Sequence, residues 1–424
     1  MIYAKKRKLG RGVSIVGAGL SQFGAFKEKS GRDLFVEAFL DLQSHMDKSL
    51  DPKDIEAAYM GNFSSELFEN QGHTGPIIAD WIGIAPRPVT RIENACASSG
   101  SALREGIMAI ASGMYDIVLV GGMEKMTNLP TEGVTDVLAT AADSQYEVPA
   151  GLTFPGIYAA IATAYMDRYE GNLDQLLKVG IKNHENGALN PKAQFNVTIK
   201  SLMERRIARS QERGEVIPDW NDELDFLRDA RVNPWIAWPL RLYDCAPITD
   251  GGSCMLLVAS ELASNFTDIP VHIVASSQAS GPPLQDAEEI TSLSAARHAG
   301  TMAYDMAGLT SSQIQIAEVH DCFTIAEIVA TEDLGFFKPG DGARAAEEGQ
   351  TALAGTRPIN TSGGLKAKGH PVGASGVGQA VEIFHQLRGE AGDRQVQNKN
   401  LEFGLTHNVG GTGGTCVVHI LQRG

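Results

Sequence analysis

The sequence predicts an α/β protein, and three observations support this fold class. Continuous apolar runs, VSIVGAG (13–19) and DIVLVGGME (116–124), are typical of strands buried on both faces. Between these runs, apolar residues recur at helical spacing after residue 96. A similar order of small-residue loop, helix, strand and glycine turn returns near the end of the chain. This echo indicates either two similar halves or two unrelated βα units that share a pattern.

The elements of the first half follow in order along the chain. The stretch VSIVGAG is a strand that enters a glycine turn, and AAYMGNF (57–63) is a second strand. Apolar residues every three or four positions then predict a helix over 98–112, which Gly113 ends. The run at 116–124 completes this half as a buried strand.

The second half shows the same alternation. The segments VHIVASS (271–277) and IQIAEVH (314–320) are predicted strands. The segment GASGVGQAVEIFHQLRG (373–389) is predicted to be a helix that opens with glycine, with one apolar face. Finally, FGLTHNVGGTGGTCVVHIL (403–421) predicts two strands joined by a glycine-rich turn.

The middle of the chain differs from both halves. Residues 158–171 are helical in pattern, and residues 204–234 are charged and carry no strand signals. We interpret residues 124–242 as an inserted loop-and-helix region over the ligand site, with the charge run as a solvated face. The predicted division is an N-terminal half (1–123 and 243–268), the insertion (124–242) and a C-terminal half (269–424).

Composition excludes several functions. The chain has 424 residues, 43% of them hydrophobic, and a net charge of −15, which argues against nucleic acid as a partner. The sequence has no apolar stretch of about 18 residues, so no membrane span is expected. The basic start, MIYAKKRKLGRG, is not followed by a signal core, and the end, LQRG, is no peroxisomal signal. We therefore expect a cytoplasmic protein.

Five cysteines without a CxxC pair indicate neither a disulfide framework nor a zinc site. Cys96 is unusual because small residues surround it at the start of the predicted helix over 98–112. That position would favour the thiolate, leave room for a substrate carbonyl and aim the Cys96 N–H at an oxyanion. The alternative is an inert, buried cysteine.

Candidate partners for a thiol nucleophile lie in the second half. His370 stands in a glycine-dense loop that would expose its imidazole, so it is the candidate base. The alternative is a phosphate cradle, but GHPVGASG lacks the P-loop ending. His320 and Cys322 alternate in EVHDCFTIAE and would share one face. A metal site of His320, Asp321 and Cys322 is disfavoured, because successive residues rarely all reach one ion.

The last glycine-rich segment, THNVGGTGG (406–414), has two interpretations. Its backbone N–H groups could approach a bound carbonyl, or the segment could be a plain hairpin turn.

Together and in this order, these segments resemble the motifs of the thiolase superfamily over nearly the whole chain. NACASSG (94–100) resembles the nucleophile motif, GHPVGASG (369–376) the histidine motif and NVGGTGG (408–414) the final glycine loop. NPKAQF (190–195) and PITDGGSCMLLVAS (247–260) resemble thiolase segments that flank the inserted region.

At two positions the chain differs from most thiolases, and these differences indicate which group of thiolases it resembles. Most thiolases carry Asn-Glu-Ala-Phe where this chain has His-Asp-Cys-Phe (320–323), and Cys-x-Gly where it has Asn-Val-Gly (408–410). His-Asp-Cys-Phe is the mark of the sterol-carrier-protein-type thiolases and their bacterial and archaeal relatives. The resemblance therefore implies that Cys322 is the second acid/base and that His320 replaces the oxyanion-site asparagine.

The same resemblance implies a two-step acyl transfer. His370 takes the proton of Cys96, whose thiolate attacks a 3-oxoacyl-CoA, and Cys322 protonates the carbanion that leaves. His320 and His370 hold the thioester oxygen, while the N–H groups of Cys96 and Gly410 hold the tetrahedral oxyanion. Coenzyme A is the co-substrate, and no metal or permanently bound cofactor is expected.

The implied fold is the five-layered α-β-α-β-α thiolase arrangement, made from two similar halves with an inserted loop domain. The implied assembly is a homodimer or homotetramer. The resemblance locates no contacts for the adenine and 3′-phosphate of coenzyme A, and the insertion at 124–242 is the candidate region.

Several alternatives remain open from the sequence. The same residues would catalyse Claisen condensation to acetoacetyl-CoA as well as degradative cleavage. A small zinc-ribbon/OB-fold subunit could be needed, with a bulky or aromatic substrate such as benzoylsuccinyl-CoA. A ketoacyl-synthase type usually pairs its cysteine with two histidines, or with histidine and asparagine, so Cys322 argues against it. A non-catalytic, thiolase-like binding subunit would not need Cys96, Cys322 and His370 together.

Overall fold

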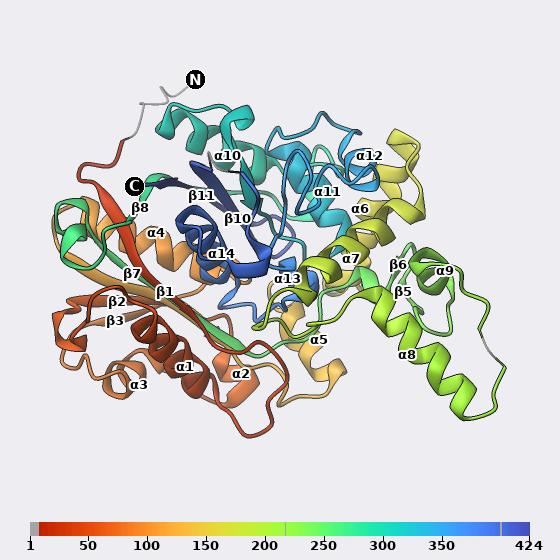
Figure 1. Cartoon of the computed structure of the whole chain (residues 1–424), viewed down its shortest axis with the longest axis horizontal. Coiled ribbons are helices and arrows are strands. Elements are labelled where there is room, and N and C mark those ends of the chain that lie inside the picture. Colours follow the sequence, from red (N-terminus) through yellow and green to blue (C-terminus); the bar gives the residue numbers. More distant parts are fainter. Residues whose placement is uncertain (1–7, 217, 399–400) are drawn as a thin grey trace.

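One nine-stranded mixed sheet organises the molecule. The computed structural model describes residues 8–216, 218–398 and 401–424, and Figure 1 shows its elements. The strand order is β3-β2-β4-β7-β1-β8-β11-β10-β9. The first half contributes β1 (Val13–Leu20), β2 (Ala57–Gly61), β3 (Val89–Ile92), β4 (Ile117–Glu124) and β7 (Gly251–Ala259). The second half contributes β8 (Val271–Ser280), β9 (Ile316–Glu318), β10 (Phe403–Gly410) and β11 (Thr415–Arg423).

The two halves of the sheet are joined at a narrow seam. Strands β1 and β8 share only two register pairs, Ser14 with His272 and Ile15 with Val271. By contrast, β1 pairs with β7 and β8 pairs with β11 along most of their lengths. The sheet therefore behaves as two half-sheets linked at one corner, which agrees with the predicted two halves.

Helices cover both half-sheets and fill the space between them. On the outer face of the first half lie α1 (Gly31–Ser44) and α3 (Thr74–Trp81). On the outer face of the second lie α10 (Ser294–Ala307) and α11 (Thr324–Asp333). The central layer is α4 (Ser98–Ala111) against α14 (Ser375–Arg388), with α4 on β2 and β4 and α14 on β10 and β7 (Figure 1). The five-layered prediction is thus confirmed.

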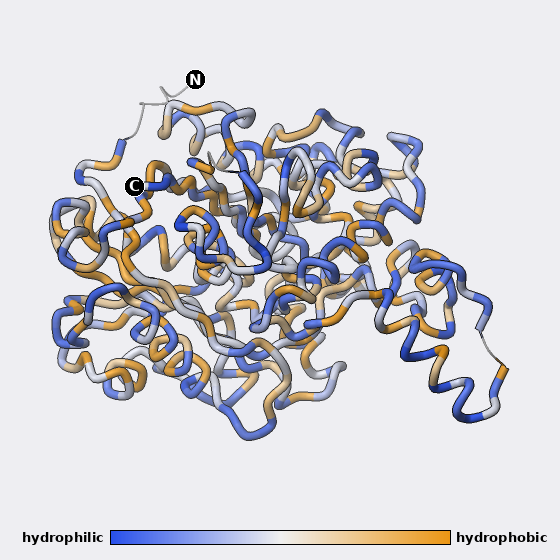
Figure 2. The backbone as a smooth tube through the Cα atoms, viewed as in Figure 1, coloured by the Kyte–Doolittle hydropathy of each residue, from blue (hydrophilic) through white to orange (hydrophobic). Residues whose placement is uncertain are grey.

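The segment between β4 and β7 is mainly helical. It contains α5 (Thr131–Ala139), α6 (Phe154–Tyr169), α7 (Leu173–Ala188), α8 (Ile199–Glu212), α9 (Glu223–Arg228) and the small sheet of β5 (Trp235–Ala237) and β6 (Leu240–Arg241). Figure 1 shows α8 and α9 at one end of the molecule, away from the sheet, and Figure 2 shows α8 as largely hydrophilic. The division of the chain at residues 123, 242 and 268 stays a prediction.

Other elements differ from the sequence expectations in extent. Strand β9 covers only three of the seven residues predicted at 314–320, because the chain leaves the sheet before His320. Strands β3 and β7 were not predicted as strands, although β7 is buried throughout. Short helices α2 (Ser65–Glu69), α12 (Gly342–Glu347) and α13 (Gly364–Ala367) complete the set. Among the described residues, no helix has the length and apolarity that crossing a membrane requires.

The two central helices cross at backbone distance. A Cβ on Gly376 of α14 would lie 2.4 Å from the backbone nitrogen of Gly100 of α4, and 2.3 Å from Oδ1 of Asn408. A Cβ on Gly100 would lie 2.6 Å from the same oxygen. The backbone N–H of Val377 donates to Oγ of Ser99 across this crossing at 3.1 Å. Both helix starts therefore require glycine here.

This crossing predicts the effect of adding one methyl group. Gly376→Ala should lower the free energy of unfolding by about 1–3 kcal/mol, because the methyl group would collide with Oδ1 of the buried Asn408 and with the backbone of Gly100. Urea unfolding measures the change. Gly378→Ala on the same helix is the matched control: its Cβ would meet nothing closer than 3.6 Å, so it should leave stability equal or raised. Equal stability of the two variants would contradict the close crossing.

Candidate active site

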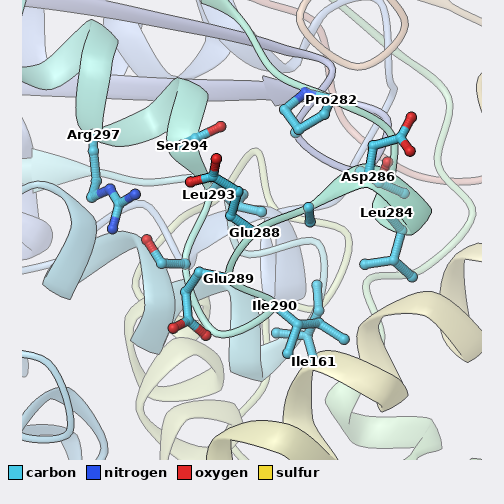
Figure 3. A pocket seen from close by; sticks show the side chains of 14 residues that line it. Ile161, Pro282, Leu284, Asp286, Glu288, Glu289, Ile290, Leu293, Ser294 and Arg297 are labelled. Atoms are coloured by element: carbon cyan, nitrogen blue, oxygen red, sulfur yellow. The ribbon is translucent and has the colours of Figure 1, made fainter.

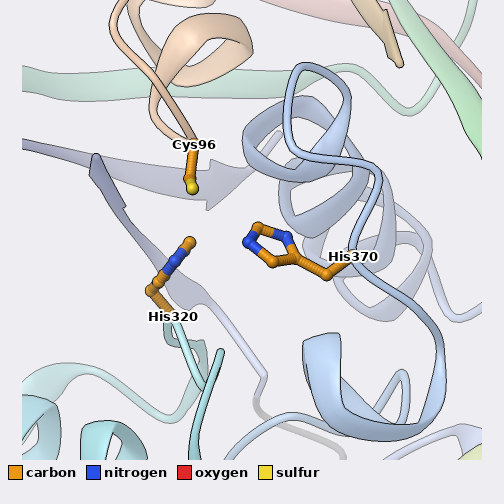
Figure 4. Close-up of side chains that lie close together, drawn as sticks. All are labelled: Cys96, His320 and His370. Carbon is orange, nitrogen blue, oxygen red and sulfur yellow. The ribbon is translucent and has the colours of Figure 1, made fainter. Parts of the chain in front are cut away.

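Three side chains from three separate elements converge between the two central helices. Cys96 lies in the turn before α4, His320 lies two residues after the end of β9, and His370 lies in the loop between α13 and α14. The sulfur of Cys96 and one ring nitrogen from each histidine lie within 4.8 Å of one another. The imidazole centroids are 5.1 Å apart and nearly perpendicular, and Figure 4 shows all three side chains pointing to a common space.

A strained turn presents Cys96. Ala95 has a φ of 49°, a left-handed conformation that costs a non-glycine residue about 1–2 kcal/mol. The N–H groups of Ala97 and Ser98 donate to the carbonyls of Asn94 and Ala95, which closes the turn into α4. This turn places Cys96 just ahead of the helix rather than within it, so its thiol points into the site.

Burial controls the protonation of Cys96. The residue is partly exposed, but the surrounding protein raises the pKa of its thiol to about 12, and the carboxylate of Glu124 adds to the rise. Hydrogen bonds from the N–H of Gly411 and from its own N–H oppose this shift. The N–H of Cys96 at the helix start thus favours the thiolate as expected, but burial outweighs it, and Cys96 of the resting protein is a neutral thiol at pH 7.

His370 is held as a neutral base. Oγ of Ser375 lies 2.7 Å from Nδ1 of His370 and donates its own proton to the carbonyl of Pro371. Oγ must therefore accept the hydrogen bond from His370, so Nδ1 of His370 carries the proton. The lone pair is then left on Nε2, the ring nitrogen that Figure 4 shows on the side of Cys96. Burial and the charge of Lys368 lower the pKa of His370 to about 3. Sequence predicted an exposed imidazole; instead only 8% of His370 is exposed.

His320 is also neutral and even more deeply enclosed. Burial lowers its pKa well below the usual value, and the neighbouring His370 and His407 lower it further. Its Nδ1 lies 3.2 Å from Nδ2 of Asn408, and its backbone N–H donates to Nδ1 of His407. Strand β10 therefore fixes both the ring and the backbone of His320.

Cys322 is not part of the close group of Cys96, His320 and His370; it interacts with the thiol of Cys96 but packs in a hydrophobic cluster, with 9% exposed. Burial raises the pKa of its thiol well above the ordinary value, and proximity to Cys96 raises it further. A hydrogen bond with the Tyr158 hydroxyl lowers the pKa of the Cys322 thiol and so partly offsets this rise. The ring of Tyr158 stacks on Phe323 at 4.7 Å, which holds that hydroxyl in place. Tyr158 was not among the predicted site residues, because in sequence it only continues the apolar pattern of a helix.

Asp321, between the two reacting positions, has a structural task. Its carboxylate accepts hydrogen bonds from the N–H of Leu365 and from Nδ2 of Asn183, both at 2.7 Å. It thereby anchors the segment that leads to His370. A Cβ on Gly364 would lie 2.1 Å from this carboxylate, so glycine is required there.

The final glycine loop packs tightly against the Cys96 turn. A Cβ on Gly410 would lie 2.3 Å from the carbonyl oxygen of Asn94, so no side chain fits there. The hydrogen bond to the Cys96 sulfur comes from the N–H of the next residue, Gly411. The role of the Gly410 N–H in holding an oxyanion stays a prediction.

Two hollows adjoin this loop. One of about 560 Å³ flanks Cys96 and is lined by Phe63, Glu66, Arg91, Glu93, Asn94, Ala95, Thr140, Ala141, Gly410, Gly411, Gly414 and Thr415. The other, of about 330 Å³, lies between α6 and the segment 282–297, reaches Thr412 and Gly413, and carries acidic side chains (Figure 3). None of the four predicted reacting side chains lines either hollow, so the convergence of Cys96, His320 and His370, rather than a hollow, marks the candidate site.

A thiol beside a neutral imidazole, each supplied by one half of the fold, is the arrangement of an enzyme that uses a cysteine nucleophile. The model of the thiolase N-terminal domain matches residues 13–261. The model of the thiolase C-terminal domain-like family matches residues 276–423. The chain belongs to the thiolase family.

Individual relatives agree with this membership. The chain is 44% identical to an acetyl-CoA acetyltransferase of Methanothermobacter thermautotrophicus, over 97% of this chain and all of that protein. It is 28% identical to human sterol carrier protein 2, over 98% of this chain and 72% of that protein. It is 27% identical to the benzoylsuccinyl-CoA thiolase subunit BbsB of Thauera aromatica, over 95% and 96% of the two chains.

A solved structure shares the fold. The chain superposes on one from the Ltp2-ChsH2(DUF35) aldolase with a TM-score of 0.78 and 24% identity, covering 98% of both chains.

The raised pKa of Cys96 predicts how its alkylation depends on pH. Only the thiolate reacts, and pH 7–9 lies below a pKa of about 12, so the iodoacetamide rate should rise about tenfold per pH unit. Peptide mass spectrometry reads the rate at Cys96. Cys245, half-buried and with its pKa also raised to about 12 by burial, is the internal control. A rate at Cys96 that stays flat above pH 7 would show a preformed thiolate and contradict this account.

Proposed function

We propose that the protein transfers an acetyl group between CoA thioesters through an acetyl-Cys96 intermediate, with acetoacetyl-CoA as the substrate in the cleavage direction. The observation that carries this proposal is the convergence of Cys96, His320 and His370 with both Nδ1 atoms already engaged. The acetyl group is proposed from the name of the relatives at 44% and 40% identity, acetyl-CoA acetyltransferase.

The first half-reaction uses two thiols and one imidazole. Nε2 of His370 takes the proton of Cys96, and the thiolate attacks the 3-keto carbon. The bond between C2 and C3 breaks, and its electron pair becomes the enolate of acetyl-CoA. Cys322 then gives its proton to C2, and acetyl-CoA leaves. The raised pKa of Cys322 suits this step, because it keeps the thiol protonated until the carbanion forms.

The second half-reaction returns every proton. The buried Cys322 thiolate is a strong base and takes the proton of the incoming CoA thiol. The CoA thiolate attacks the acetyl-Cys96 carbonyl, Cys96 leaves as a thiolate, and the imidazolium of His370 reprotonates it. The N–H groups of Cys96 and Gly410 are proposed to hold the tetrahedral oxyanion, and His320 is proposed to hold the thioester oxygen.

The direction of flux is a separate matter. Cleavage, predicted from the sequence as degradative, and Claisen condensation to acetoacetyl-CoA use the same atoms in reverse order. All described cysteines are free, which agrees with a reducing compartment, and we propose the cytoplasm. The 124–242 region remains the proposed contact for the nucleotide of coenzyme A.

Intact-mass analysis tests the acyl intermediate. After mixing with acetoacetyl-CoA, the protein should gain the mass of one acetyl group, and digestion should place it on Cys96. Cys96→Ala should abolish the gain. Cys254→Ala is the matched control, because Cys254 lies in the hydrophobic core away from the site and should leave acetylation intact. An unmodified wild-type protein across a panel of 3-oxoacyl-CoA thioesters would favour a non-catalytic binding subunit.

A second candidate is the catalytic subunit of a two-component thiolase. The relative named as a subunit and the neighbour named with DUF35 both come from assemblies with a second protein. In this chain the β5–β6 hairpin exposes Trp235, Ile236 and Trp238. The chain that follows this hairpin contacts the site, because the N–H of Ala246, five residues after β6, donates to the carbonyl of Cys322. We propose this hairpin as the contact for a small zinc-ribbon/OB-fold subunit that helps to bind coenzyme A.

Purification from native cells tests both the partner and the assembly. The tagged chain should bring down a small zinc-binding protein in a homodimer or homotetramer, with the mass read by light scattering. Trp238→Ser should lose the partner, whereas Trp81→Ser, which changes another exposed tryptophan (49% against 62% for Trp238) on α3, should keep it. Full thiolysis by the purified chain alone would contradict the partner proposal and leave the acetyl-transfer proposal intact.

A further inference from the structure

Asn408 occupies a closed position between the reacting groups and the helix crossing. The residue is 1% exposed and lies on β10, in the loop position where this chain departs from the usual Cys-x-Gly. Its Nδ2 lies 3.0 Å from the carbonyl oxygen of Cys96 and 3.2 Å from Nδ1 of His320. Its Oδ1 faces Gly100 and Gly376, where only glycine leaves room.

The contact with Cys96 determines the orientation of the Asn408 amide. A carbonyl oxygen only accepts hydrogen bonds, so the atom that faces the Cys96 carbonyl is the amide nitrogen. An amide nitrogen only donates, so Nδ1 of His320 must accept from the same group. A neutral imidazole carries a single proton, and burial keeps His320 neutral. With Nδ1 as acceptor, that proton is on Nε2.

The two histidines of the site therefore hold opposite tautomers. Ser375 accepts from Nδ1–H of His370 and leaves a lone pair on Nε2, which suits a base. Asn408 donates to Nδ1 of His320 and leaves a proton on Nε2, which suits a hydrogen-bond donor to a developing negative charge. Without such control, two neutral imidazoles 5.1 Å apart could exchange roles.

We propose that Asn408 is a positioning residue that sets the Nε2–H tautomer of His320 and so makes this histidine the donor to the enolate oxygen of the substrate. The catalytic use of that donor rests on the proposed acyl transfer. The tautomer itself does not, because it is a property of the ligand-free protein. The same amide ties His320 to the backbone of Cys96, so the donor and the nucleophile keep a constant separation.

Nitrogen-15 NMR of histidine-labelled, ligand-free protein tests the tautomer directly. His320, assigned as the signal lost in His320→Gln, should show a bare Nδ1 and a protonated Nε2. His370, assigned likewise, should show the reverse. A protonated Nδ1 on His320 in the wild-type protein would overturn the proposal, and this measurement requires no variant of Asn408 to fold.

Asn408→Asp tests whether the amide of Asn408 is the cause of the His320 tautomer. The carboxylate has the same shape but accepts, so Nδ1 of His320 should become protonated and the thiolysis kcat should fall about 100-fold, as for loss of one oxyanion donor. If Asn408 had only a structural role, the substitution would leave the nitrogen-15 signals of Nδ1 and Nε2 of His320 unchanged. Thr406→Val is the matched control: it removes a buried, unpartnered hydroxyl of the same strand and should keep both the tautomer and kcat. Nδ1 remaining bare in Asn408→Asp would overturn the proposal, whatever substrate the enzyme uses.

Discussion

The close crossing of α4 and α14 is the constraint on which the site depends. Gly100 and Gly376 let the two helix starts meet at backbone distance, and each helix is entered by a loop that carries a reacting residue. Cys96 stands two residues before α4 and His370 five residues before α14. Because the helices come from different halves, neither half alone contains the site, and their distance at this crossing sets the distance between thiol and imidazole.

Burial determines the charge state of the two thiols and two imidazoles that meet at this crossing. Removal from water raises the pKa of both thiols and lowers the pKa of both imidazoles, so the resting site holds four neutral groups. In the proposed reaction, charges arise only when a proton moves from the sulfur of Cys96 to the nitrogen of His370. In a site of low dielectric constant, N–H donors that are already oriented stabilise such charges more strongly than water-exposed donors would.

The surrounding carboxylates hold loops rather than act on substrate. Asp321 anchors the segment ahead of His370, and Glu124 accepts from the N–H groups of Phe63 and Gly373, which joins the two halves near Cys96. Strand β10 supplies Asn408, whose amide contacts both the carbonyl of Cys96 and Nδ1 of His320. From this position, with Nδ2 3.2 Å from Nδ1 of His320, the amide of Asn408 can orient that ring.

The sequence by itself predicted an α/β protein and several of its strands and helices, because buried strands and helix periodicity are local patterns, and its short motifs identified the thiolase family. The prediction of Cys96, His320, Cys322 and His370 as reacting residues rests on that resemblance. It could not reveal β3 and β7 as strands, the enclosure of His370 or the part played by Tyr158, since each depends on what packs from elsewhere in the chain. Asn408 is an example of what the sequence could not show. Its amide contacts Cys96 and His320, which lie 312 and 88 residues away in the chain, so its role is visible only in the folded protein. Protonation states and tautomers were decided by the tertiary structure alone, because burial and hydrogen-bond partners exist only after the halves have met.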